Sequence, residues 1–171
     1  ASAANFILEV EMMKKTIFKG IATALITPFK NGEIDYSAFA RIIEEQIAAG
    51  VDALVVAGTT GECSTLTDEE QFDLIEFAVK QVNKRIPVIA GTGSNDPRHG
   101  IKLCQGACER GADALLIVTP YYNKTSQRGL IAHYYALANA SSKPIIVYNV
   151  PSRTGMTIAP ETYVELAKHP M

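Results

Sequence analysis

Two adjacent threonines stand between two glycines in the segment Gly58-Thr59-Thr60-Gly61-Glu62. The apolar run 53–57 precedes it and is typical of a buried strand. A helix start follows at Thr67, where Glu70 completes a capping box. The segment is therefore predicted to be a strand-to-helix turn whose hydroxyl and N–H donors suit a small carboxylate. An ordinary tight turn, in which the threonines bind no ligand, explains the same spacing.

The segment belongs to a repeating pattern of apolar runs and helices. Runs rich in β-forming residues begin about thirty residues apart, the length of a βα unit, near Ile21, Ala53, Ile86, Ala114 and Ile145. Helices are predicted after them, with Asp35, Thr67 and Asp96 as N-caps, over residues 36–49, 68–84, 97–111, 127–140 and 160–168. This alternation predicts one α/β domain with a parallel sheet. Periodicity leaves open whether that sheet is doubly wound or the first five units of a (β/α)8 barrel.

Polar segments follow each of these apolar runs. They are 27–28, 58–62, 91–95, 119–123 and 148–153, and they contain hydroxyls, phenols and Arg153. In both architectures the carboxyl ends of parallel strands meet at one edge, where ligands bind. We therefore expect an active site at this edge. Taken alone, Tyr121, Tyr122 and Arg153 are equally typical of loop packing and a solvated charge.

Composition narrows the function classes. The net charge of −2 gives no electrostatic case for nucleic acid or an anionic membrane. The three cysteines, Cys63, Cys104 and Cys108, make neither a disulfide framework nor a metal spacing, which predicts no metal and a reducing, cytoplasmic setting. Residues 1–12 precede Met13 and Lys14 and are interpreted as an extension or a cloning remnant. The domain is then expected to occupy 13–171.

Four motifs in the order GTTGE, GTGSN, TPYYN and YNVPSRTG resemble those of the pyruvate-dependent class I aldolases, the N-acetylneuraminate lyase family. The resemblance covers about residues 17–167 and implies a (β/α)8 TIM barrel, of which this chain supplies about five units. It is closest to members that condense pyruvate, as a lysine Schiff base, with aspartate semialdehyde in lysine and diaminopimelate biosynthesis. These members are lyases that need no cofactor.

The resemblance also assigns roles to single residues. Thr59 and Thr60 would bind the pyruvate carboxylate, and Thr60, Tyr148 and Tyr122 would form a proton relay. Arg153 would bind the carboxylate of aspartate semialdehyde and steady Tyr148. Because Tyr122 reaches into a neighbouring subunit in this family, the resemblance implies a homo-oligomer, a dimer of dimers.

Two departures from the family pattern stand out. The Schiff-base lysine of the family lies at the end of the sixth strand, a few residues past Met171, so the gene product is expected to be longer and this chain inactive alone. Lysine-inhibited members carry other residues at the positions of Gln71 and His99. Weak or absent feedback inhibition by lysine is therefore expected.

Two other functions remain open. An N-acetylneuraminate or 2-keto-3-deoxy-sugar aldolase shares the family motifs, but sugar aldolases usually have no arginine at the position of Arg153. A fragment that serves only as a non-catalytic folding or assembly module is the alternative outside enzymes.

Overall fold

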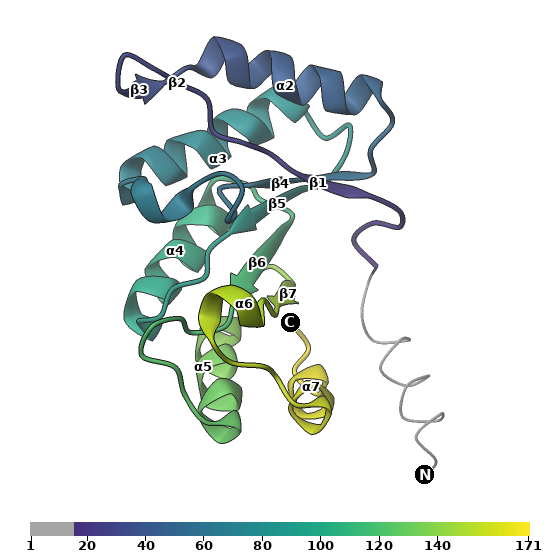
Figure 1. The fold of residues 1–171 in the computed structure, drawn as a ribbon. Coiled ribbons are helices and arrows are strands. Elements are labelled where there is room, and N and C mark those ends of the chain that lie inside the picture. Colours follow the sequence, from purple (N-terminus) through teal and green to yellow (C-terminus); the bar gives the residue numbers. More distant parts are fainter. Residues whose placement is uncertain (1–15) are drawn as a thin grey trace.

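Five parallel strands form the sheet at the centre of the computed structural model, which describes residues 16–171 (Figure 1). The strands are β1 (Ala22–Ala24), β4 (Ala53–Val56), β5 (Val88–Gly91), β6 (Ala114–Val118) and β7 (Ile145–Tyr148). Each lies close to a predicted apolar run. Pro87 cannot donate a ladder hydrogen bond, and β5 accordingly begins one residue after it.

The strand order distinguishes the two architectures that periodicity left open. The sheet runs β1-β4-β5-β6-β7, so each new strand adds on the same side of the last. A doubly wound sheet reverses this direction at its switch point and has helices on both faces. Here α2, α3, α4 and α5 follow one another along one side of the sheet (Figure 1). This is the arrangement of the first part of a TIM barrel.

The main helices begin where the sequence predicts. They are α2 (Tyr36–Ala48), α3 (Asp68–Val82), α4 (Pro97–Glu109), α5 (Gln127–Asn139) and α7 (Pro160–Ala167). Asp35, Thr67 and Asp96 each accept a hydrogen bond from a backbone N–H of the first turn. The capping box is complete, since the Glu70 carboxylate accepts from the N–H of Thr67 at 2.8 Å.

The structure corrects two helix ends and adds short elements. Helix α4 ends at Glu109, two residues before the predicted end at 111. Helix α3 ends at Val82, not near Lys84, because Asn83 and Lys84 have φ of 48° and 61° and so leave the helical region. The Asn31-Gly32 pair, with φ of 56° and 86°, turns a small hairpin that the Asn-Gly signal should have predicted. The added elements are β2 (Phe29–Lys30), β3 (Glu33–Ile34), η1 (Cys63–Thr65) and α6 (Pro151–Thr154).

The two faces of the sheet carry different cores. The face under the helices packs large side chains that are fully buried, among them Leu54, Leu74, Leu115 and Leu137. Each such side chain contributes about 1.5–3 kcal/mol when buried. The opposite face carries a smaller cluster of Ala53, Val55, Ile89 and Ala114. Side chains alternate between these faces because the pleat has a period of two.

The predicted extension, residues 1–12, lies outside the described residues. Within residues 16–171 no helix has both the length and the apolar character that crossing a membrane requires.

Candidate functional site

A cavity of about 630 Å³ opens at the carboxyl ends of the strands. Four of the five predicted polar segments reach its wall, through Thr59, Glu62, Gly93, Tyr121, Val150 and Arg153. The fifth segment lies behind the wall, where the buried Thr27 hydroxyl donates to the carbonyl of Gly61 at 2.7 Å. The strand ends therefore converge as the sequence predicts.

The turn 58–62 is tightly folded. Ala57, the residue before the turn, and Glu62, its last residue, adopt left-handed conformations with φ of 53° and 58°. Such conformations are uncommon outside glycine and often occur at functional sites. The N–H of Glu62 donates to the carbonyl of Thr59 at 3.1 Å. Within the described part of the chain, the N–H groups of Thr59, Thr60 and Gly61 have no acceptor, which leaves them free for an anion.

Close backbone contacts hold this turn against the next strand. A Cβ built on Gly91 would lie 2.2 Å from the carbonyl oxygen of Ala57, so only glycine fits there. From the helix side, the buried Gln71 amide donates to the carbonyl of Gly91 at 2.7 Å. Helix α3 thus fixes the end of β5, which in turn supports the threonine turn.

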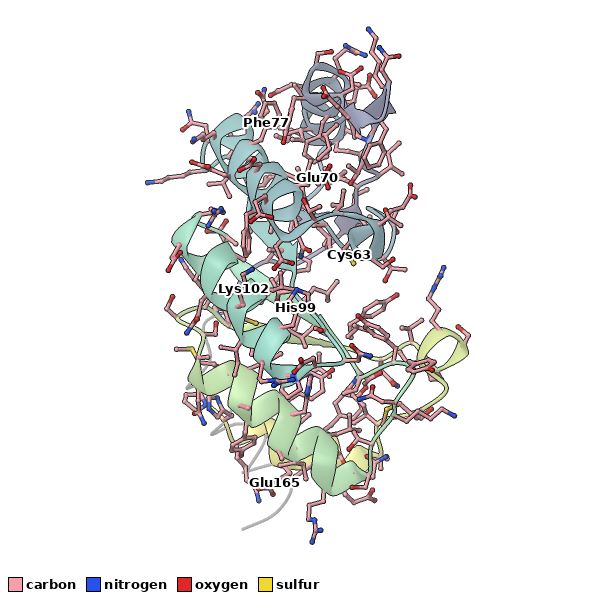
Figure 2. The ribbon with its side chains drawn as sticks, turned by 90° about the vertical axis from the view of Figure 1, so that its left-hand side faces the viewer. Cys63, Glu70, Phe77, His99, Lys102 and Glu165 are labelled. Atoms are coloured by element: carbon pink, nitrogen blue, oxygen red, sulfur yellow. The ribbon has the colours of Figure 1, made fainter. Side chains whose placement is uncertain are left out.

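Charged groups connect α3 and α4 at the cavity wall. Asp68 accepts from His99 Nε2 at 2.8 Å and from Lys102 Nζ at 2.6 Å, and His99 Nδ1 lies 3.1 Å from the hydroxyl of Ser94. Figure 2 shows His99 and Lys102 on α4, on the side that faces α3. Hydrogen bonds from Lys102 and His99 lower the pKa of Asp68, so this carboxylate is ionised at neutral pH.

Cys63 also lines the cavity, next to the threonine turn. Burial raises the pKa of its thiol, so the neutral form dominates at physiological pH. The thiol is therefore a poor nucleophile in this environment. No chemistry was assigned to it from the sequence, and its surroundings give no reason to assign any.

The structure brings two of the predicted site residues together at the cavity, Thr59 and Arg153. Arg153 stands in α6, and its exposed guanidinium has no carboxylate partner among residues 16–171. Both threonines are exposed, but Thr60 does not contribute to the cavity wall. The structure thus separates the two threonines that the sequence treats alike.

The two predicted relay tyrosines lie outside the cavity wall. Tyr148 ends β7, is half-buried and pairs in register with Val118, which does line the cavity. Tyr122 is 92% exposed and has a φ of 65°. Its side chain is therefore almost wholly open to solvent and contributes little to the packing of the described chain.

Sequence reasoning missed two features of the wall. Glu62 was read only as the end of the turn, and the Asp68–His99–Lys102 cluster was not predicted. The capping box signalled that Asp68 begins a helix, but only the packing of α3 on α4 brings it to His99.

Comparisons with known proteins agree with this geometry. Residues 17–171 match the model of the dihydrodipicolinate synthetase family. A 4-hydroxy-tetrahydrodipicolinate synthase from Exiguobacterium sibiricum is 57% identical over 155 residues, which is 90% of this chain and 53% of that protein. The chain thus spans about half the length of the curated relatives it matches.

Solved structures give the same result. A chloride-inhibited dihydrodipicolinate synthase from Acinetobacter baumannii, complexed with pyruvate, superposes with a TM-score of 0.88 at 47% identity, covering 91% of this chain and 53% of that one. A structure described as the first monomeric dihydrodipicolinate synthase variant has a TM-score of 0.84 at 44% identity, covering 85% of this chain and 49% of that one. The chain belongs to the dihydrodipicolinate synthetase family.

Proposed function

We propose that this chain is the N-terminal half of a 4-hydroxy-tetrahydrodipicolinate synthase, a lyase of lysine and diaminopimelate biosynthesis. The observation that carries the proposal is the shared cavity of Thr59 and Arg153 at the strand ends. This supports the proposal because hydroxyl and N–H donors suit one carboxylate and a guanidinium suits another. Pyruvate and aspartate semialdehyde each bring one carboxylate.

In the proposed reaction a lysine amine condenses with the pyruvate ketone and loses water, giving a Schiff base. Loss of a methyl proton gives an enamine, whose carbon attacks the aldehyde carbon of aspartate semialdehyde. Attack by the substrate's own amine then closes the ring with release of the enzyme lysine. Within this chain, Thr59 and the free N–H groups of the turn hold the pyruvate carboxylate, and Arg153 holds that of the aldehyde.

We propose that Tyr148, Tyr122 and a threonine carry protons between these groups and solvent. Thr60 is the threonine that the family resemblance implies, whereas the cavity wall favours Thr59. The exposure of Tyr122 supports a relay completed across a subunit contact. A homo-oligomer, built as a dimer of dimers in the cytoplasm, is therefore part of the proposal.

Borohydride reduction in the presence of pyruvate tests the proposed chemistry. Reduction fixes a Schiff base as a stable lysine adduct that mass spectrometry detects. We expect an adduct on the full-length protein and none on residues 1–171, because we propose that the nucleophile lies in the half of the relatives that this chain does not cover. An adduct on the 171-residue chain itself would contradict this assignment, and its absence from both would leave the non-catalytic function.

Two assays, one of condensation and one of sugar-acid cleavage, separate the synthase from a sugar aldolase. We expect condensation of pyruvate with aspartate semialdehyde and no cleavage of N-acetylneuraminate, because Arg153 suits a small carboxylated aldehyde. Faster cleavage of the sugar acid would favour the alternative.

Feedback by lysine is expected to be weak or absent. The buried Gln71 amide already donates to Gly91, and His99 is engaged by Asp68 and Ser94. Titrating the active protein with lysine checks this expectation. Half-inhibition below about 1 mM, which corresponds to a binding free energy of about 4 kcal/mol, would contradict it and show that lysine binds despite these two residues.

A further inference from the structure

Gln127, the first residue of α5, makes three hydrogen bonds to the segment that follows Arg153. Its Nε2 donates to the carbonyl of Thr157 at 2.9 Å. Its Oε1 accepts from the N–H of Ala159 at 2.9 Å and from the hydroxyl of Thr162 at 2.7 Å. An exposed side chain normally samples several rotamers, so three hydrogen bonds from the exposed Gln127 amide indicate that it helps to hold this segment in place.

The segment 149–162 makes no other side-chain hydrogen bond to the rest of the described chain, although Ile158 is buried in the core and Met156 packs against it. Its remaining hydrogen bonds are internal, such as that from Ile158 N–H to Asn149 Oδ1 and those of the Thr154 hydroxyl to Val150 and Met156. Between β7 and the start of α7, the segment is thus held by the apolar packing of Ile158 and by the hydrogen bonds of Gln127. Packing sets the depth of the segment, and Gln127 is the polar contact that fixes it to α5 on both sides of Ile158.

Gln127 also completes the start of α7. The N-cap residue of that helix, Ala159, has no side chain that can accept a hydrogen bond. Gln127, from a different helix, accepts from the backbone N–H of Ala159 itself, which is the bond that the N3 side chain makes in a capping box. Because Thr162 is buried, its hydroxyl needs the same acceptor. The amide thus holds the position at which the chain enters α7, a few residues after α6 ends.

We propose that Gln127 is a positioning residue for Arg153, a role that rests on the proposed function. Arg153 lies six residues before Ala159, in a helix of four residues that packs no large side chain of its own into the core. Without the anchor, α6 can shift relative to the cavity. The guanidinium would then miss the carboxylate of the aldehyde, while the pyruvate site at the threonine turn stays intact.

The test compares Gln127→Ala, Gln127→Glu and Thr162→Val in the full-length synthase, with Arg128→Ala as the matched control. Arg128 is the exposed neighbour on the same helix turn and makes no side-chain ion pair within residues 16–171. For Gln127→Ala we expect the KM for aspartate semialdehyde to rise about tenfold, with the KM for pyruvate and borohydride trapping unchanged. Gln127→Glu keeps both acceptor bonds and should recover part of the loss.

Thr162→Val removes one of the three bonds and keeps the side-chain volume. Its effect on the KM for the aldehyde should be smaller than that of Gln127→Ala and should not add to it in the double variant. In hydrogen exchange, amides of 156–162 should lose protection in Gln127→Ala but not in Arg128→Ala.

Equal rises in both KM values, or a response of Arg128→Ala as large as that of Gln127→Ala, would overturn the positioning role. An unchanged KM for the aldehyde in Gln127→Ala would do the same while leaving the synthase intact. If the wild-type protein fails to condense aspartate semialdehyde, the proposed function itself fails, and the positioning role fails with it.

Discussion

Replacing Arg153 with alanine should raise the KM for aspartate semialdehyde about 30- to 150-fold in the full-length protein, because a charge-assisted, bidentate contact contributes about 2 to 3 kcal/mol. Arg153 lines the cavity and has no carboxylate partner within the described residues, so its guanidinium is available to a ligand. Steady-state kinetics with each substrate varied in turn measures the effect. The KM for pyruvate should change by less than about threefold, because Thr59 and the turn remain.

Two further variants make this result specific. Arg153→Lys keeps the charge but loses the planar fork, so it should recover only part of the affinity. Arg98→Ala removes an exposed arginine that pairs locally with Asp96 and should leave both KM values unchanged. A similar loss in Arg98→Ala would mean that overall charge, not the position of Arg153, governs binding of the aldehyde.

Replacing Gly91 with alanine should destabilise the protein by at least about 3 kcal/mol, and lower Tm by about 6 to 12 °C. The added Cβ would lie 2.2 Å from the carbonyl oxygen of Ala57 and 2.8 Å from Cα of Gly58. Both are backbone atoms of the threonine turn and cannot move aside as a side chain can. Thermal or urea unfolding measures the effect.

Gly100→Ala is the matched control for this substitution. Gly100 is also buried, but a Cβ there would approach only the Leu137 side chain, at 3.1 Å from Cδ2. A side-chain end can rotate, and alanine favours a helix interior more than glycine does, so the change should stay within about 1 kcal/mol. Equal stability of Gly91→Ala and wild type would show that β5 does not approach the turn this closely.

Local signals in the sequence predicted the helix starts well. Caps such as Asp35 and Thr67 are satisfied by their own backbone neighbours, so a few adjacent residues are enough to specify them. The end of α3 was less predictable. Asn83 and Lys84 both turn left-handed there, and lysine gives no signal for such a conformation.

Only the tertiary structure separates Thr59 from Thr60. Adjacent residues in a turn point in different directions, and here only Thr59 lines the cavity, two residues after the left-handed Ala57. An isolated alanine rarely adopts a left-handed conformation. Here the carbonyl of Ala57 packs closely against Gly91, a contact that exists only once the sheet has formed. Pairs such as Asp68 with His99 or Gln127 with Thr162 likewise depend on which helices become neighbours.

The sequence by itself determined the alternation of strands and helices, the helix starts and the edge at which the polar segments meet. Each of these depends on burial and hydrogen bonding within a few residues, which apolar periodicity and capping residues record directly. Tertiary structure decided the strand order that periodicity left open, and it confirms the barrel that the family motifs implied. It also decided which side chains of those segments face the cavity, because such directions arise only when distant segments pack against one another.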